Sequence, residues 1–556
     1  MNIKKTTLAI LLTLTLSACS EANVTDVETE TAAAQTETSS TQTETTAAET
    51  SDQAVETTAE LTETSAAKTK PAKDYFEEQG YKLESSTLYI DMNNFTNSEE
   101  PLVGIDEEYL KKVHFVTVEN AGSSDLSFLK KYSFNWFTLE GYSGNADFSE
   151  MDISFITLDD YKGGDLTSLP EYEYLRLKFK NYSGNEDMSF IADLKSIHHL
   201  VFENYRDESD LDFIADCPNI TSLNLINKSI NAEAVADVIQ NSNIKTLSIK
   251  TEDYSSKDAD IIMRAAPTCA VRYYLDDSPW SDGRPEEGIT FFTNMYFSPD
   301  HPGNWECQTA DASTYYPEIW RHSGSLVCTF SNFTEEVQRI NSAEIFKYEK
   351  GVLTPIPFSD GSLVYDIDFT IDPGTNSDYE ITNEVFPFNE CETGIYTIAF
   401  NSDGGRLEQK FVIHRSGDDF LTEEQHEAVD TAYEITKKYF GYSIYMPQEY
   451  ADEHTVDDFL SEICLGYTYD YAYSTAQRYR YIDENGNLQA ASSDKGGDIS
   501  YQGSFLMPIY SDDNEVLFKD FIIHGHEDNP YFIWFEEVNY HMVKTENGWR
   551  FDNFQF

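Results

Sequence analysis

Residues 137–161 read FTLEGYSGNADFSEMDISFITLDDY and contain two copies of one pattern. Each copy has a short apolar strand, Phe137-Thr138-Leu139 or Ile156-Thr157-Leu158, and a tyrosine three residues after it, Tyr142 or Tyr161. The second apolar position recurs at residues 118, 139, 158, 179, 202, 225 and 249, with spacings of 21, 19, 21, 23, 23 and 24. A fixed period in this range is typical of stacked repeat units, each built on one strand.

A second register accompanies the strands. An acidic residue followed by an apolar one comes seven or eight residues after the strand position, at Asp125-Leu126, Asp147-Phe148, Asp165-Leu166, Asp187-Met188 and Asp210-Leu211. Two registers that recur together over five units resemble the leucine-rich-repeat arrays of bacterial, short-repeat type. The resemblance implies an α/β solenoid, which we place at residues 74–280.

The array departs from the family pattern at the position of the usual Asn ladder. That position holds Tyr142, Tyr161, Tyr182 and Tyr205, and Asn stands one place earlier in several units, at Asn120, Asn181, Asn204 and Asn227. The departure leaves the ladder hydrogen bonds and the curvature open, but not the stacking. Helical patterns at Ala232–Gln240 and Lys257–Ala266 predict that the convex side thickens toward a cap.

Alternate residues of the predicted strands point to solvent if the strands line one face. The candidate ligand-binding residues on this face are Thr138, Glu140, Thr157, Asp159, Lys178, Lys180 and Glu203. The pair Lys178 and Lys180 predicts a basic centre on a concave face with an acidic end. The alternative is a solvated sheet face whose charges only keep the protein soluble, and the sequence leaves both interpretations open.

The N-terminus indicates export. Residues 1–19 have Lys4 and Lys5 followed by an apolar core that is too short to span a bilayer, which is typical of a signal peptide. The segment ends in Leu16-Ser17-Ala18-Cys19, which resembles the lipobox of bacterial lipoproteins. The resemblance implies a lipid on Cys19 and an extracytoplasmic position at the cell membrane. Residues 20–73 are rich in Thr, Glu and Ala without an aromatic residue, so we predict a disordered stalk.

Two further domains are predicted. Residues 285–416 carry period-two strands without helices, which favours a β-sandwich resembling bacterial immunoglobulin-like modules. Cys328 and Cys391 are spaced like an immunoglobulin pair, but Cys391 precedes its strand, so no bridge is predicted. Residues 418–556 begin with a helix at Glu423–Tyr439 and a second helix near Thr455.

The rest of residues 418–556 reads as an antiparallel sheet. Four alternating tyrosines favour a strand, lining a pocket or packing in a core: Tyr467, Tyr469, Tyr471 and Tyr473. Strand-like runs follow at 515–524, 531–535 and 540–545, and the chain closes on Gly548-Trp549-Arg550-Phe551. Helices followed by a curved sheet resemble the cone-shaped nuclear-transport-factor-two-like or cystatin-like folds. The expected fold class is therefore multidomain: a stalk, a solenoid, a β-sandwich and an α+β domain.

The composition of the chain excludes some classes of partner and of scaffold. The 556 residues include 99 acidic side chains against 38 Lys and Arg, a formal net charge of −61. This charge repels phosphate, so we expect no nucleic-acid partner. Aromatic residues make up 14% of the chain, enough to build cores outside the stalk. Seven cysteines are too few for a disulfide-stapled scaffold, and the pairing of the six besides Cys19 stays open.

Catalytic and metal motifs are incomplete. The run from His426 to Asp430 resembles a zinc-protease motif with Asp in place of the second His, so we interpret it as a solvated helix face. His524-Gly525-His526 has no third ligand nearby, and we expect an exposed turn. No cofactor is predicted.

The leading hypothesis is a lipid-anchored binding or adhesion protein at the cell surface. It is expected to capture an extracellular protein or glycan on the solenoid face without catalysis. The alternative is an envelope enzyme or enzyme regulator with its site in residues 418–556. Solute capture for transport is disfavoured because no two-lobed α/β pattern is present.

Overall fold

The computed structural model describes residues 80–275 with short gaps, 289–293, 296–297, 325–413, 420–440, 443–494, 501–526 and 529–554. The short gaps are residues 85, 96–101, 103–109, 111, 133, 171–174, 185 and 207, and residues 484 and 495–500 are also outside. The predicted signal peptide, Cys19 and the stalk lie outside the described residues. No helix in the described part is long and apolar enough to cross a membrane.

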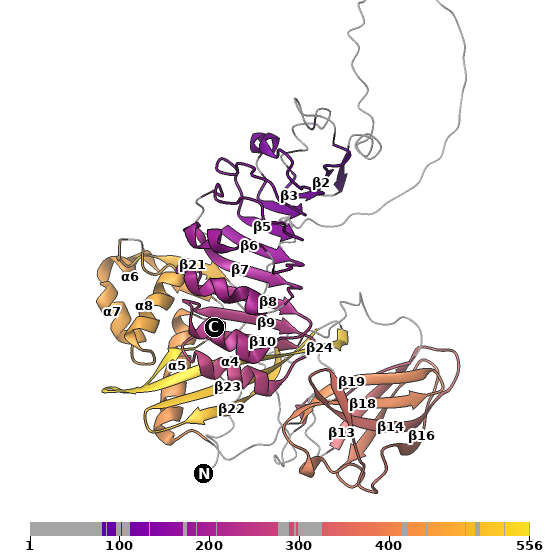
Figure 1. Cartoon of the computed structure of the whole chain (residues 1–556). Helices are drawn as coiled ribbons and strands as arrows, with labels where there is room; N and C mark the ends of the chain where they lie inside the picture. The colour runs from indigo at the N-terminus through magenta and orange to yellow at the C-terminus, as the bar shows by residue number, and fades with distance from the viewer. Residues whose placement is uncertain are drawn as a thin grey trace, which may run out of the picture.

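The first half of the described chain forms a ladder of strands, one per repeat (Figure 1). Strands β2 to β10 pair in parallel in chain order, and β1 closes the N-terminal end as the antiparallel partner of β2. The seven predicted strands are confirmed within β3 to β9. The bounds are β1 Tyr81–Glu84, β2 Thr87–Asp91, β3 Phe115–Glu119, β4 Trp136–Glu140, β5 Phe155–Asp159, β6 Leu175–Lys180, β7 Ile197–Glu203, β8 Ser222–Asn227, β9 Thr246–Thr251 and β10 Ala270–Leu275.

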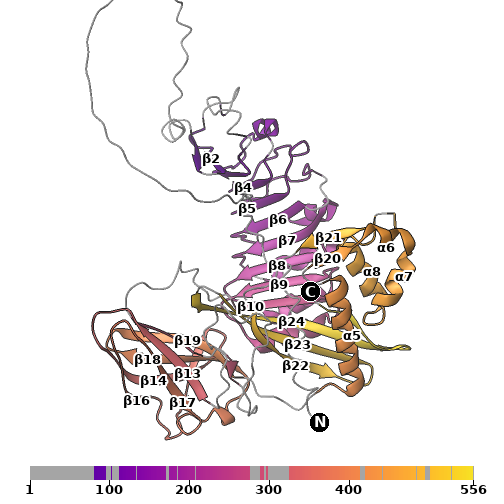
Figure 2. The same cartoon turned by 180° about the vertical axis from the view of Figure 1, so that it is seen from behind.

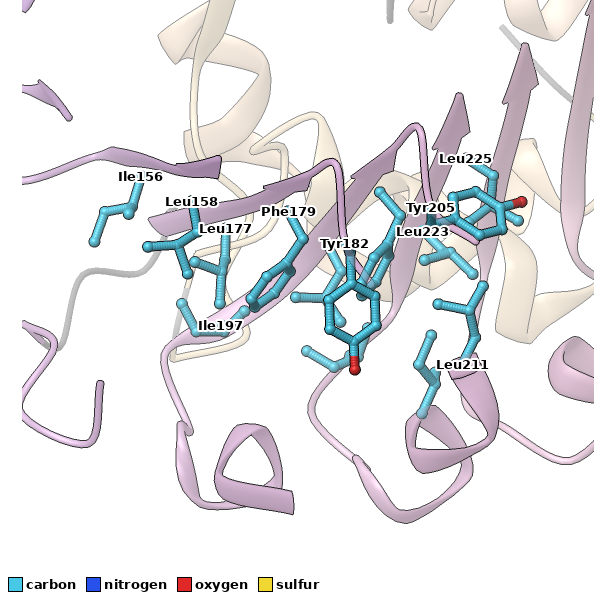
Figure 3. Packing of buried hydrophobic residues seen from close by; sticks show 14 of the residues in the cluster. Ile156, Leu158, Leu177, Phe179, Tyr182, Ile197, Tyr205, Leu211, Leu223 and Leu225 are labelled. Atoms are coloured by element: carbon cyan, nitrogen blue, oxygen red, sulfur yellow. The ribbon is translucent and has the colours of Figure 1, made fainter. Parts of the chain in front are cut away.

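Alternation along each strand decides which side chains enter the core. Ile156, Leu158, Leu177 and Phe179 are buried and lie next to one another beneath the strands (Figure 3). Each inward residue therefore packs between the equivalent residues of the units before and after it. Removing apolar surface from water in this way stabilises by about 25 cal/mol per Å².

The tyrosines take the place of the usual Asn ladder. Tyr142 is fully buried, and its hydroxyl accepts a hydrogen bond from the Ala146 amide at 2.8 Å and donates to the Asp165 carbonyl of the next unit at 3.2 Å. A Cβ atom on Gly164 would lie 2.4 Å from the Tyr142 ring, so only glycine lets the ring approach the next unit. The Tyr142 hydroxyl thus joins two neighbouring loops, whereas the hydroxyls of Tyr161 and Tyr182 donate to carbonyls of their own units.

The asparagines one place earlier form the turn instead. Asn120, Asn181 and Asn204 have positive φ angles of 55°, 54° and 53°, a left-handed conformation that Asn tolerates better than most residues. Asn120 donates to the Asp91 carboxylate at 2.9 Å, and Asn181 donates to Asp159 at 2.6 Å. The turn residues therefore also tie each unit to the one before it.

The recurring acidic residues have a local structural role. The Asp125 carboxylate accepts the Ser127 amide at 2.9 Å, and Asp165 and Asp187 accept the amides of Thr167 and Ser189 at 2.8 and 2.9 Å. These hydrogen bonds close Asx-turns and hold the pKa of the three carboxyls below the ordinary value. The acidic residue that recurs after the strands in the sequence is thus a signal for a turn.

The convex side thickens along the array, as predicted. Early units have 3₁₀ turns, and the last units have α-helices that begin and end within one residue of the predicted bounds. The elements are η3 Ser127–Lys131, η4 Ser189–Asp193, η5 Glu208–Asp216, α3 Ala232–Gln240 and α4 Ser256–Ala265.

The sheet continues past the repeats into the C-terminal part of the chain. Strand β10 pairs antiparallel with β24, with Tyr273 opposite Glu537, and the order then runs β24-β23-β22, with β25 also paired to β24. The bounds are β22 Tyr501–Ser511, β23 Glu515–His526, β24 Asn529–Thr545 and β25 Gly548–Asn553. The two regions that the sequence divides into separate domains thus share one 14-stranded sheet.

Helices precede these strands. Helix α5 has the predicted bounds Glu423–Tyr439 and begins with a capping box at Thr422, and Thr455 caps α7. The other elements are α6 Gln448–Glu453, α7 Val456–Ile463, α8 Tyr469–Arg478, β20 Ser443–Met446 and β21 Ala491–Asp494. We call the part of the chain that contains β11 to β19, within residues 289–413, the middle region. In both views helices α5 to α8 and the middle region lie on opposite sides of the C-terminal end of the ladder (Figures 1 and 2).

The strand predicted for the four alternating tyrosines is wrong. Three of them lie in α8, where Tyr469 and Tyr473 stack four residues apart on the outer face, with ring centroids 6.2 Å apart. Ala472 and Ala476 form the buried face of this helix, a period that the tyrosines obscured. Tyr467 is buried before the helix and Tyr469 is 55% exposed, so the four do not line a common pocket.

The middle region forms two sheets that pack on each other, with Phe330 of one against Phe400 of the other at 5.0 Å. Cys328 and Cys391 are both buried in this region. The bounds are β11 Ile289–Thr293, β12 Tyr296–Phe297, β13 Ser325–Asn332, β14 Gln338–Glu349, β15 Val352–Ile356, β16 Tyr365–Ile371, β17 Asn376–Thr382, η6 Phe388–Glu390, β18 Gly394–Ser402 and β19 Gly405–Ile413.

The β14–β15 turn docks this region on the last repeat. The Lys350 ammonium lies 2.7 Å from the Asp258 carboxylate, and the Tyr348 hydroxyl donates to the Glu252 carbonyl at 2.5 Å. The middle region therefore touches the array directly and is not held by its linkers alone.

A buried charge network joins α4 to the C-terminal strands. The Lys519 side chain is 1% exposed, and its ammonium lies 2.7 Å from carboxylate oxygens of both Asp260 and Glu537. It also donates to the Ser256 hydroxyl at 2.6 Å, and that hydroxyl donates to Glu537 at 2.7 Å. The network fixes the position of the last helix of the array relative to β23 and β24.

We expect Lys519→Met to destabilise the protein by about 3–5 kcal/mol, because it leaves the fully buried Glu537 carboxylate and the partly buried Asp260 carboxylate without their cation. Urea unfolding should show the loss as a lower transition midpoint. The double variant Lys519→Met with Glu537→Gln should recover part of it, since the buried charge is then removed as well. An unchanged midpoint in the single variant would contradict this role.

Candidate functional site

The seven predicted site residues lie on one face of the array, in two adjacent rows. In the parallel register Thr138 pairs with Thr157 and Thr157 with Lys178. One row further along the strands are Glu140, Asp159, Lys180 and Glu203. None of the seven is buried in the core. We call the outward side of β2 to β10, which carries these rows, the solenoid face.

The predicted basic centre is not a free positive patch. The Lys178 ammonium lies 2.5 Å from Glu203, and that of Lys180 lies 3.1 Å from Asp159. The hydrogen bond to Asp159 raises the pKa of Lys180 above the ordinary value. Both cations are therefore neutralised by carboxylates on neighbouring strands, which the spacing along a single strand did not reveal.

A third row on the same face is aromatic. Phe115, Trp136 and Phe155 stand opposite one another at the start of β3, β4 and β5. The rings of Trp136 and Phe155 are stacked at 4.8 Å with an interplanar angle of 17°, and Phe115 meets Trp136 at 5.2 Å and 68°. Trp136 is 38% exposed. The sequence analysis missed this row, although extending the alternation by one residue before Phe137 and Ile156 would have found it.

Carboxylates dominate the row at the other end of the same strands. Asp91 stands opposite Glu119 on β2 and β3, and Glu140 stands opposite Asp159 on β4 and β5, with neighbouring strands about 4.8 Å apart. Asp159 is paired with Lys180, and Asp91 accepts hydrogen bonds from Asn120 and Asn94. Within the described residues, neither Glu119 nor Glu140 has a Lys or Arg at ion-pair distance.

The face is covered toward its C-terminal end. Val201 in β7 is 3% exposed, and Arg272 in β10 is 7% exposed. The Arg272 guanidinium lies 3.0 Å from the carboxylate of Glu536, and the same carboxylate lies 3.1 Å from the His524 imidazole. The outward residues of β8 and β9 are half-buried, whereas β4 and β6 carry outward residues that are exposed, namely Trp136, Glu140 and Arg176. We call the part of the solenoid face on β2 to β6 the open end.

The predicted exposed turn at His524 is wrong. His524 lies within β23, is buried, and stacks on Trp534 with ring centroids 4.7 Å apart. His426 lies on α5, as expected. Among the described residues, no group of three His, Cys, Asp or Glu side chains could hold a metal ion.

Among the described cysteines, Cys217, Cys269 and Cys464 are free thiols. Cys217, Cys269, Cys328 and Cys391 are buried, and Cys464 is half-buried. Burial raises the pKa of Cys269 to about 12, so its thiol stays protonated near neutral pH.

Comparisons with known proteins give no family. No protein family matches the chain, and no curated protein matches it. Among solved structures, an internalin (inlF) from Listeria monocytogenes is 14% identical over 34% of this chain and 81% of its own, with a TM-score of 0.14. The endo-beta-1,4-mannanase from Thermotoga petrophila is 6% identical over 48% of this chain and 66% of its own, with a TM-score of 0.13. TM-scores this low do not establish a shared fold.

The solenoid face contains a group whose protonation destabilises the fold. His199 in β7 contacts the Ser222 hydroxyl at 2.8 Å, and burial, with a smaller contribution from Arg176, lowers the pKa of its imidazole to about 4. Because the ordinary value is 6.5, the unfolded chain binds a proton that the folded chain does not, from pH 6.5 down to about 4. The stability that neutral His199 provides is complete above this range and is lost as the pH falls through it.

We expect the free energy of unfolding to fall as the pH drops through this window, with His199 contributing about 1–3 kcal/mol of the change. His199→Gln should flatten the dependence, because Gln can keep the contact with Ser222 and does not titrate. Urea unfolding at several pH values measures both proteins. Parallel curves for the two would exclude His199 as the cause.

Proposed function

We propose that this protein is a binding or adhesion protein that captures an extracellular protein or glycan on the solenoid face. The observation that supports this most is the open end, where an aromatic row, a row of threonine hydroxyls and a row of carboxylates lie side by side on β3 to β5. Exposed large apolar side chains beside ordered polar groups are typical of recognition surfaces. Further along the same face, Val201 in β7 and Arg272 in β10 are buried.

The proposed role is non-catalytic. The acid and base groups that gather in the described residues, such as Lys519 with Glu537 and His524 with Glu536, are buried and paired with one another. In these positions they hold β23 and β24 in place. The support for binding over catalysis is thus that the accessible groups lie on a sheet face, whereas Lys519 with Glu537 and His524 with Glu536 are enclosed.

The position in the cell belongs to the same proposal. The lipobox ending in Cys19 supports a lipid anchor on the outer side of the cell membrane, and the acidic segment 20–73 supports a tether. A flexible chain of this length has a root-mean-square span of about 40 Å.

Blocking the open end tests the function. Thr138→Tyr with Thr157→Tyr places two bulky, strand-compatible side chains in the threonine row, and we expect at least about tenfold weaker capture of ligands found in a screen of extracellular proteins and glycans. The matched control is Asn224→Tyr with Ser248→Tyr, which changes the same row on β8 and β9. Capture that is equal for both variants and the unmodified protein would reject the proposal.

Metabolic labelling with a fatty acid tests the anchor. We expect label on the full-length protein in its bacterial host and none on Cys19→Ser, because the thiol is the group that carries the lipid. The matched control is Cys464→Ser, which also removes one thiol. Label that persists in Cys19→Ser would remove the anchor from the proposal and leave the binding face unaffected.

A further inference from the structure

We propose that the open end of the solenoid face recognises a basic segment of a partner protein, one that places Lys or Arg side chains on the carboxylate row and an apolar side chain on the aromatic row. This inference rests on the proposed function and names the chemistry of the ligand. Glycans and acidic ligands are the alternatives that the test below separates.

The carboxylate row provides the charge. Glu119 and Glu140 stand on adjacent strands, flanked by Asp91 and Asp159, and the two glutamates have no ion-pair partner among the described residues. Like charges at neighbouring positions of a sheet destabilise it. Lys180 on β6 pairs with Asp159 on β5, so it compensates the negative charge at the β5 end of the row and not at the β2 end. A bound cation would relieve the remaining repulsion, which is the electrostatic complementarity that favours a basic partner.

The ring geometry disfavours a sugar as the main ligand. Trp136 is stacked on Phe155 at 17° and lies against Phe115 on its other neighbouring strand, so the rings cover one another. A sugar platform needs an open ring face, and a cation–π contact needs one too. The exposed part of Trp136 offers apolar surface instead, suited to an aliphatic side chain or to the methylene stem of Lys or Arg.

The spacing of the rows suits an extended polypeptide. Trp136 and Glu140 are four residues apart on β4, which places the two rows about 13 Å apart along the strand. A chain crossing the face in extended conformation spans the same distance in about four residues. The threonine row between them, with Thr117, Thr138 and Thr157, offers hydroxyls to the intervening backbone.

The whole molecule is negatively charged, as the carboxylate row is. A formal net charge of −61 repels anionic glycans and nucleic acids and steers cationic ligands toward the protein. Because the whole surface contributes to this attraction, a test must separate the carboxylate row from the bulk charge.

The probe is a fluorescein-labelled peptide in which lysine alternates with threonine around one central leucine. The matched peptide has glutamate in place of every lysine. We expect the lysine peptide to bind and its affinity to fall with added salt, and the glutamate peptide not to bind. Glu119→Gln with Glu140→Gln should weaken the lysine peptide about tenfold, and Trp136→Ala about fivefold.

The controls remove equal charge and equal apolar exposure elsewhere. Glu427→Gln with Glu434→Gln neutralises two exposed carboxylates on α5, and Leu465→Ala truncates an exposed side chain after α7; both should leave binding of the probe within twofold. The glutamate double variant should keep or raise its melting temperature because repulsion is removed, so a loss of binding cannot come from unfolding.

Two results would overturn the inference. One is equal weakening by the two carboxylate double variants, which would assign the attraction to bulk charge. The other is unchanged binding in Glu119→Gln with Glu140→Gln. If ligands from the screen are still lost in the Thr138 and Thr157 variant but not in the Glu119 and Glu140 variant, the binding function stands and its ligand is a glycan or a non-basic protein.

Discussion

The structure depends on one constraint: a repeat strand can bury its inward side chains only between two neighbouring units. Phe179, for example, packs against Phe202 of the next strand at 5.2 Å, and an array of such units has two ends at which a neighbour is missing. At the N-terminal end β1 turns back antiparallel on β2. At the C-terminal end the missing neighbour is β24, which comes from a distant part of the chain.

This arrangement explains why the solenoid face differs between its ends. The strands and helices that close the array also enclose Arg272, so polar groups near the joint are paired and buried. At the other end Trp136 is 38% exposed, and Glu119 and Glu140 have no Lys or Arg at ion-pair distance among the described residues. The buried ion pairs thus lie where the fold is completed, and these two carboxylates lie at the opposite end of the same sheet.

The parts of the fold with a local period could be predicted from the sequence. Strands with inward residues such as Leu158, and α5 with its Thr422 cap, follow from spacing and capping residues alone. The pairing of Tyr273 with Glu537 could not be predicted, because no local pattern reports which strand an edge will meet. The tyrosines of α8 were predicted wrongly for another reason. Tyrosines at every second residue fit one face of a strand, but Tyr469 and Tyr473, which are four residues apart, also fit one face of a helix.

The candidate site was predicted in part for the same reason. Alternation placed Thr138 and Glu140 on the outward side of the strands, where the structure has them. The partners of Lys178 and Lys180 lie on other strands, and charge pairing across strands has no signature within one strand. The aromatic row needed only a longer strand than the apolar triplet suggested. Sequence reasoning therefore located the face and misjudged its electrostatics.

The distant closing strand has a consequence for biosynthesis. Tyr254 and Glu537 are hydrogen-bonded although they are 283 residues apart, so the array emerges long before the strand that completes it. During synthesis the edge of β10 stays unpaired while the whole middle region is made, and unpaired edges invite association with other chains. A prematurely ended chain would keep that edge permanently. The edge of β10 is therefore protected only after β24 has been made and has paired with it.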